Sequence, residues 1–151
     1  MRRYPPFLLI LAVLLPLDQL TKRWVMAKLA LHQSIPVLGD LFRITYVLNR
    51  GGIFGIGSRG DHPLLFIVVA FVALLFMLLY LPRVRETRTL IGLSLVFSGA
   101  VGNLMDRLRL GAVVDFLDFG YRSWRWPAFN LADAAITVGV GLLLWGALRS
   151  R

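Results

Sequence analysis

Long apolar runs separated by short polar segments dominate the chain. Four of these runs approach the length of about 20 residues that a helix needs to cross the hydrocarbon core of a membrane. A helix bonds its own backbone groups, so lipid meets only its side chains. We predict membrane-spanning helices at residues 7–25, 62–81, 89–105 and 131–148.

The positions of the arginines predict how these spans are oriented. Short cytoplasmic loops are rich in Lys and Arg. Arg2 and Arg3 precede the first span, the 83–88 segment between spans two and three holds three arginines in six residues, and Arg149 and Arg151 follow the last span. These segments share one side of a four-span protein, so we predict that both termini are cytoplasmic. The first span has no small-x-small cleavage site after it, and we expect it to be retained.

The two remaining connections, residues 26–61 and 106–130, then lie on the outer side. Within the first, the β-branched and aromatic residues of LFRITYVLN (41–49) are typical of a strand. The predicted fold is therefore an all-α membrane protein, one domain over residues 1–151, that carries a small extracytoplasmic β-rich or interfacial subdomain.

Composition agrees with this class and removes others. The chain is 58 % hydrophobic with a mean hydropathy of +0.72, which is too apolar for an ordinary soluble domain. Its net charge of +9 comes from basic residues that flank apolar runs, which favours anionic lipid over nucleic acid as the partner. Without cysteine there are no disulfides, thiolate metal sites or cysteine nucleophiles. His32 and His62 are too few and too far apart for a persuasive metal cluster, and we expect no metal or cofactor.

The carboxylates and amides fall at one depth of the predicted topology. An ionisable residue inside a span is costly and is by default a functional hypothesis. Glu86 sits apart in the cytoplasmic loop, whereas residues from distant parts of the chain converge near the outer membrane surface. This pattern is typical of a site at the membrane–water boundary. The converging residues are Asp18, Asn49, Asn103, Asp106, Asp115, Asp118, Asn130 and Asp133.

Several of these residues also have a purely structural interpretation. Asn130 is suited to cap a helix with Asp133 three residues later, as in a capping box. Asp106 and Arg107 are suited to a structural ion pair with loop partners. Asp18 is suited to bond loop backbone. None of these interpretations explains why the groups meet at one depth.

Two aspartates lie close together in VVDFLDF (113–119). If this segment is a strand, Asp115 and Asp118 point to opposite faces, so at most one of them faces a common site.

One face of the third span carries small residues at four-residue intervals. Small residues let helix backbones approach closely in lipid, so we expect this face to point at protein. Ala135 and Gly139 on the fourth span are candidates for the matching surface. The series is Ser94, Ser98, Gly102 and Asp106.

Other chemistries fit less well. The GxGxxG match at 55–60 lacks the strand and helix of a dinucleotide site. Serine–lysine catalysis needs a lysine at the level of the polar cluster, and only Lys22 is close, with no serine paired to it by spacing. A small proton- or ion-coupled transporter remains an alternative, although its key carboxylate is expected near the midplane. A non-catalytic membrane subunit is a third possibility.

The chain resembles the lipoprotein signal peptidases (signal peptidase II). The order and spacing of the matching motifs fit the family over nearly the whole chain, and the set is highly specific. The motifs are DQLTK (18–22), NRGGIF (49–54), GNLMDR (102–107), VVDFLDF (113–119) and FNLAD (129–133).

The resemblance implies a metal-independent aspartic endopeptidase. Such an enzyme removes the signal peptide of a bacterial prolipoprotein on the N-terminal side of a diacylglyceryl-modified cysteine. Its catalytic residues map to Asp115 and Asp133. Two close carboxylates share a proton, so one can activate a water while the other acts as an acid. Supporting residues map to Asp18, Asn49, Gly51, Asn103, Asp106, Arg107 and Asn130.

The resemblance also implies partners and a location. The partners are the lipid-modified prolipoprotein and membrane lipid, with no nucleic acid, and we expect a monomer. The protein should cross the bacterial inner membrane several times, with its active site near the extracytoplasmic surface. We expect the outer loop at residues 41–60 to clamp the substrate from above.

Overall fold

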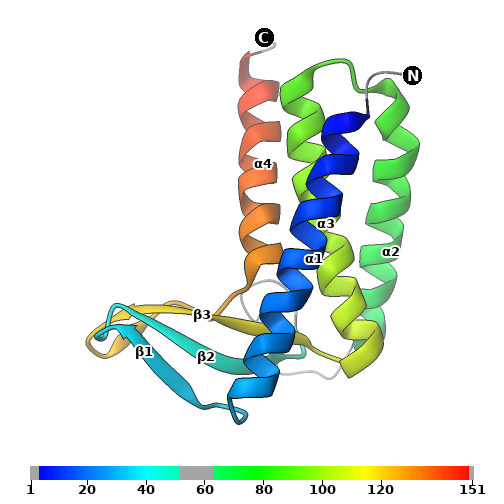
Figure 1. The fold of residues 1–151 in the computed structure, drawn as a ribbon. Coiled ribbons are helices and arrows are strands. Elements are labelled where there is room, and N and C mark those ends of the chain that lie inside the picture. The colour runs from blue at the N-terminus through cyan, green and yellow to red at the C-terminus, as the bar shows by residue number, and fades with distance from the viewer. Residues whose placement is uncertain (1–3, 52–62, 150–151) are drawn as a thin grey trace.

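A computed structural model describes residues 4–51 and 63–149. Its helices stand side by side, and a small antiparallel sheet lies across one end of them (Figure 1). The helices are α1 (Pro5–Lys28), α2 (Pro63–Tyr80), the short 3-10 helix η2 (Leu81–Arg83), α3 (Thr87–Leu110) and α4 (Leu131–Arg149). The strands are β1 (Ser34–Leu38), β2 (Phe42–Asn49), β3 (Val113–Tyr121) and β4 (Trp124–Arg125).

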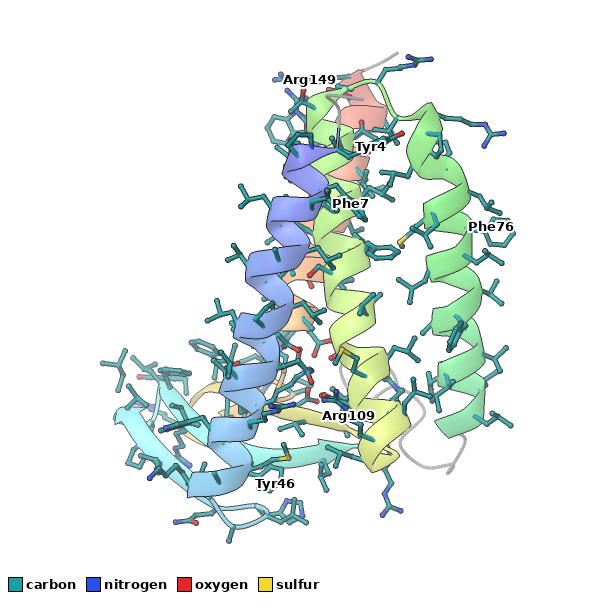
Figure 2. The ribbon with its side chains drawn as sticks, turned by 45° about the vertical axis from the view of Figure 1, so that its right-hand side comes forward. Tyr4, Phe7, Tyr46, Phe76, Arg109 and Arg149 are labelled. Carbon is teal, nitrogen blue, oxygen red and sulfur yellow. The ribbon has the colours of Figure 1, made fainter. Side chains whose placement is uncertain are left out.

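The prediction of membrane-spanning helices is confirmed. Helices α1, α3 and α4 and the segment Leu64–Arg83 are each long and apolar enough to cross a membrane. The apolar side chains of α2 face outward, and Phe76 points away from the bundle (Figure 2). Both described ends of the chain lie at the end of the bundle opposite the sheet (Figure 1). The predicted start of span two at His62 falls outside the described residues.

Helix α3 is the centre of the bundle. In its most apolar stretch 61 % of the residues are buried, against 6 % for α2. The small-residue face is buried as expected, with Ser94 and Ser98 each 1 % exposed. The close backbone contacts with α4 use a different face. A Cβ on Gly139 would lie 2.6 Å from the carbonyl oxygen of Gly92, and a Cβ on Gly99 would lie closer still to the carbonyl oxygen of Ala132. The prediction that Gly139 matches the serine series was therefore wrong.

The third helix is longer than predicted. It continues to Leu110 and ends at Gly111, whose φ of +67° is the left-handed conformation that glycine adopts readily. Gly111 N–H donates to the carbonyl of Arg107 at this end. Asp106 and Arg107 therefore lie on the last turns of a rigid helix and not in an outer loop that starts at residue 106.

The sheet is larger than the strand signal at 41–49 suggested. Its strands follow the order β1-β2-β3-β4, all antiparallel. Pairing of β2 with β3 is irregular between Ile44 and Val47, where β2 holds one extra residue. Such a bulge bends the strand and re-aims the side chains beyond it. Beyond this bulge, Val47 pairs with Asp115.

Candidate active site

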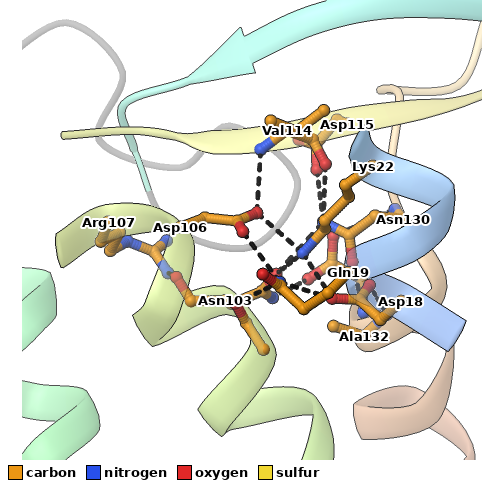
Figure 3. Close-up of polar contacts among 12 residues, drawn as sticks. Asp18, Gln19, Lys22, Asn103, Asp106, Arg107, Val114, Asp115, Asn130 and Ala132 are labelled. Atoms are coloured by element: carbon orange, nitrogen blue, oxygen red, sulfur yellow. Dashed lines mark hydrogen bonds and ion pairs between the residues drawn. The ribbon is translucent and has the colours of Figure 1, made fainter. Parts of the chain in front are cut away.

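The polar residues meet where the sheet reaches the helices. Strand β3 supplies Asp115 and the first turn of α4 supplies Asp133. Helices α1 and α3 supply the surrounding polar side chains (Figure 3). Asp115 is 1 % exposed and Asp133 6 %. The structure thus brings together residues that are separated by more than a hundred positions in the chain.

Asn130 joins the two aspartates and also starts α4. Its Oδ1 accepts the backbone N–H of Asp133 at 2.9 Å, and its own backbone N–H donates to Asp133 Oδ2 at 3.4 Å. This reciprocal pair is the capping box that the spacing suggested. The Nδ2 of Asn130 donates to Asp115 Oδ1 at 2.7 Å. Asn130 therefore caps α4 and also contacts Asp115, because its Oδ1 serves the cap and its Nδ2 serves the contact.

Asp115 has amide partners on both carboxylate oxygens. Asn49 Nδ2 donates to Oδ2 at 3.0 Å, opposite the bond from Asn130. Burial, and then the charge of Asp133, raise the pKa of Asp115 to about 7. The two amide hydrogen bonds and the charge of Lys22 act in the lowering direction. Asp115 therefore exchanges a proton close to neutral pH.

Asp133 is held in a similar way. Asn103 Nδ2 donates to Asp133 Oδ1 at 2.8 Å. With the backbone N–H of Asn130 on Oδ2, both oxygens of Asp133 accept from nitrogen. Within residues 4–51 and 63–149, neither Asp115 nor Asp133 forms an ion pair.

A buried lysine lies beside this pair. Lys22 Nζ lies 2.9 Å from Asp18 Oδ2 and 2.8 Å from Asp106 Oδ2. It also donates to Asn103 Oδ1 at 3.0 Å. Asp18, Asn103 and Asp106 were predicted to belong to the site, whereas Lys22 was not. The four-residue spacing between Asp18 and Lys22 on one apolar helix is the signal that could have included it.

Asp18 and Asp106 also tie the helices to their neighbours. Asp18 Oδ1 accepts the backbone N–H of Ala132 at 3.0 Å, on the first turn of α4. A Cβ at position 102 would lie 2.7 Å from Asp18 Oδ2, so Gly102 leaves the space that this carboxylate occupies. Asp106 Oδ2 accepts the backbone N–H of Val114 at 3.3 Å. The suggestion that Asp18 bonds only loop backbone was wrong, since its partners are Lys22 and a helix end.

Gln19 is a second residue that the sequence analysis missed. Its Nε2 donates to Asp106 Oδ1 at 3.0 Å, and its Oε1 accepts from Arg109 at 3.2 Å. It follows Asp18 on a helix face that the pattern of apolar residues does not single out.

Arg107 connects the helices to the outer segment. Its Nη2 donates to the carbonyl of Gly51 at 2.8 Å, and Gly51 N–H donates to Asn49 Oδ1 at 2.9 Å. The suggested ion pair with loop partners was wrong for Asp106, because its ion-pair partner is Lys22 of α1. Arg107 does bond the outer segment, through the carbonyl of Gly51. The 55–60 glycine motif and most of the suggested 41–60 clamp beyond Gly51 fall outside the described residues.

Two open clefts reach the aspartates. One, of about 300 Å³, is lined by Asp115, the end of β2 at 47–49, Arg50 and residues 127–128. The other, of about 330 Å³, runs along α4 beside Asp133 and is almost wholly apolar. The second cleft is lined by Trp126, Phe129, Asp133, Ala134, Thr137 and Val138. Each cleft is thus lined by one of the two carboxylates, and the cleft beside Asp115 is the more polar of the two.

Asp118 belongs to a different cluster. It accepts from Arg125 Nε at 2.7 Å and from Thr45 Oγ1 at 2.8 Å. Asp115 and Asp118 thus have separate partners, as their spacing on a strand predicted. Asp118 is buried like Asp115, with 8 % of its surface exposed. Among the described residues, no group of three or more His, Asp or Glu is placed to hold a metal ion.

Comparison with known proteins decides the family. The family model described as signal peptidase (SPase) II matches residues 10–149. The chain belongs to the signal peptidase II family.

Relatives within signal peptidase II are similar over most of their length. A lipoprotein signal peptidase of Geobacter metallireducens is 47 % identical over 97 % of this chain and 92 % of its own. One from Halothermothrix orenii is 43 % identical over 91 % of each chain.

Two solved structures share the fold. Both are described as bacterial membrane enzyme structures, with TM-scores of 0.87 and 0.83 at 28 % and 27 % identity. They match 95 % and 96 % of this chain, and 87 % and 94 % of their own. As a signal peptidase II family member with apolar helices, the chain is a multi-span membrane peptidase, and the transporter alternative is not favoured.

Proposed function

We propose that the chain is an aspartic endopeptidase that cleaves prolipoproteins on the N-terminal side of a diacylglyceryl-modified cysteine. Membership of the signal peptidase II family supports removal of signal peptides from prolipoproteins. The observation that carries the aspartic mechanism is the pair Asp115 and Asp133, two buried carboxylates joined by one amide and free of ion pairs within the described residues.

The mechanism uses one proton shared by the pair. Two neighbouring carboxylates do not both ionise easily, so one keeps a proton. The raised pKa of Asp115 supports Asp115 as the acid and Asp133 as the base, although the titration belongs to the pair. Asp133 takes a proton from a water whose oxygen attacks the scissile carbonyl carbon. As the C–N bond breaks, the leaving nitrogen receives a proton from Asp115.

The surrounding amides hold this geometry. Asn130 and Asn49 fix Asp115 from two sides, and Asn103 fixes Asp133. Fixed hydrogen bonds in a buried site cost no reorganisation during reaction, which is the source of much enzymatic catalysis. Four further residues act indirectly, because they join the helices and the outer segment to these amides. They are Asp18, Asp106, Arg107 and Gly51.

The clefts support a lipid-modified substrate. The apolar cleft beside Asp133 suits the diacylglyceryl group, which enters sideways from lipid along α4. The more polar cleft beside Asp115 suits the extended peptide. We infer that the sheet end faces the extracytoplasmic side of the inner membrane, because the basic 83–88 loop lies at the other end and basic loops stay inside. We further propose that the enzyme acts as a monomer without metal or cofactor.

The test uses purified protein in detergent and a synthetic lipobox peptide with a diacylglyceryl cysteine. Wild type should cleave it with a chelator present, and mass spectrometry should find the lipidated cysteine at the new N-terminus. Asp115→Asn and Asp133→Asn should each lose activity by about 10⁴-fold or more, because each variant lacks one partner in the proton transfer.

Asp40→Asn is the matched control, since Asp40 is exposed on the β1–β2 hairpin and, among the described residues, its carboxylate pairs with nearby Arg43. It should cleave like wild type. Loss of activity with the chelator, or full activity in either Asp115→Asn or Asp133→Asn, would exclude the metal-free aspartic mechanism.

A further inference from the structure

We propose that Lys22 is a positioning residue that fixes the side-chain amide of Asn103, and through it the two catalytic aspartates. This role rests on the proposed function of Asp115 and Asp133. It concerns a neighbouring residue, since Lys22 forms no ion pair with Asp115 or Asp133 among the described residues and is 1 % exposed.

The ammonium of Lys22 has a partner for every N–H. A lysine ammonium donates three hydrogen bonds and accepts none. Its acceptors are Asp18 Oδ2 at 2.9 Å, Asp106 Oδ2 at 2.8 Å and Asn103 Oδ1 at 3.0 Å. Three acceptors from two helices leave Nζ one position, between α1 and α3 (Figure 3).

This position determines which way the amide of Asn103 points. An ammonium can only donate, so the oxygen of the amide must face Lys22. The nitrogen must then face the other way, where it donates to Asp133 Oδ1 at 2.8 Å. Without the ammonium, Asn103 Oδ1 loses its shorter hydrogen bond and keeps the 3.2 Å bond from Asn130. The amide can then turn over more easily and present its oxygen to Asp133 instead of a donor.

The same oxygen links the amide to the second aspartate. Asn103 Oδ1 also accepts from Asn130 Nδ2 at 3.2 Å, and this nitrogen donates to Asp115 Oδ1 at 2.7 Å. Asn130 is itself oriented, because its Oδ1 accepts the backbone N–H of Asp133. Lys22 therefore sets one end of a hydrogen-bond network that ends on both carboxylates.

A purely structural role for Lys22 is the competing interpretation. Lys22 neutralises charge on Asp18 and Asp106, and removing one partner of a buried pair is strongly destabilising. That role accounts for two of its three hydrogen bonds. The third, to Asn103, is the one on which the positioning role depends, so the two roles separate when activity and stability are measured on the same variants.

The first experiment measures kcat, KM and Tm for Lys22→Met, with Arg23→Met as the control. Arg23 is the next residue of the same helix and is exposed. For Lys22→Met we expect kcat to fall about 100-fold, because a shift of about 1 Å in a catalytic group has an effect of this size. KM should stay within about threefold, because Lys22 is buried away from substrate, and Arg23→Met should match wild type. An unchanged kcat in folded Lys22→Met overturns the proposal.

A second variant covers the case in which Lys22→Met does not fold. Lys22→Met/Asp106→Asn removes one charge of each sign and keeps the net charge of the buried cluster. If Lys22 only balances charge, kcat and Tm should recover together in this variant. The positioning role predicts that Tm recovers while kcat stays low, and that Asp106→Asn alone retains at least about ten times the kcat of the double variant.

A mutant cycle with Asn103 tests the route. Lys22→Met in an Asn103→Ala background should lower kcat by less than about threefold further, since the amide through which Lys22 acts is absent. If the two substitutions instead lower kcat independently, so that the double variant loses the product of the two single losses, the route through Asn103 is overturned. The proposed function fails if Asp115→Asn or Asp133→Asn remains active. If both of these variants are inactive and Lys22→Met keeps the wild-type kcat, only the positioning role fails.

Discussion

Two pairs of buried carboxylates lie side by side at the sheet end of the bundle, and they differ in what joins them. Asp18 and Asp106 are joined by the ammonium of Lys22. Asp115 and Asp133 are joined by Asn130, a neutral amide. An ammonium compensates charge and makes the first pair a brace between helices. An amide orients the carboxylates without compensating their charge, so the second pair is suited to share a proton. This difference distinguishes the pair that can do acid–base chemistry from the pair that cannot.

The same contrast occurs within strand β3. Asp118 is nearly as buried as Asp115, but the guanidinium of Arg125 lies against it at 2.7 Å. Asp115, three residues earlier, has only amide donors from Asn49 and Asn130. Burial alone therefore does not identify a catalytic carboxylate in this protein. The absence of a bonded cation, among the described residues, is the feature that separates Asp115 from its neighbour.

Apart from substitution of the two aspartates themselves, the largest expected effect comes from removing the amide of Asn130. Asn130→Asp keeps an oxygen for the cap of α4 but cannot donate to Asp115, whereas Asn130→Ala removes both. We expect both variants to lose about 100-fold or more in kcat, the typical effect of deleting one fixed hydrogen-bond donor. Only Asn130→Ala should also show the loss of a cap, about 1 kcal/mol in the free energy of unfolding.

The peptide-cleavage assay and thermal unfolding measure these two effects separately. If Asn130→Asp cleaves at the wild-type rate, the amide is a cap and nothing more, and the comparison between the two pairs loses its basis.

A smaller effect is expected from pH. Burial and Asp133 raise the pKa of Asp115 to about 7, so its protonated form is present below that pH and is lost above it. Because the proposed acid must hold a proton, kcat should fall above about pH 7, approaching tenfold per pH unit. A pH–rate profile from 5 to 9 on the detergent-solubilised enzyme measures this. A profile that stays flat from pH 7 to 9 would argue against Asp115 as the acid.

The smallest effect is expected at the compensated carboxylate of β3. Asp118→Asn removes a charge that Arg125 already balances, outside the hydrogen-bond network of Asp115 and Asp133. We expect kcat within about threefold of wild type and a loss of about 1 kcal/mol in stability, the usual net value of one such hydrogen bond. The cleavage rate and the thermal unfolding of Asp118→Asn, measured alongside those of Asp115→Asn, test this expectation. A loss as large as that of Asp115→Asn would mean that the wrong carboxylate was chosen.

Sequence patterns predicted features that depend on local chemistry. The four spans followed from apolar length, because contact with lipid is decided by the side chains of each helix. The cap at Asn130 followed from its spacing to Asp133, because a capping box is built within four residues. The end of α3 was missed by five residues, since the charged residues Asp106, Arg107 and Arg109 interrupt the apolar run that defined the span. Selection of Asp115 over Asp118 came from family resemblance alone, and the two faces of a strand gave no preference between them.

The sequence by itself therefore determined the membrane-spanning class, the local cap and the set of polar residues that share one depth. Tertiary structure decided which of those residues meet and with what partners. Lys22 reaches Asn103 across 81 positions of the chain, and Asn49 reaches Asp115 across 66. Such contacts depend on how helices pack and how strands pair, so no local pattern records them. The lack of an ion-pair partner for Asp115 and Asp133 among the described residues is a consequence of that packing.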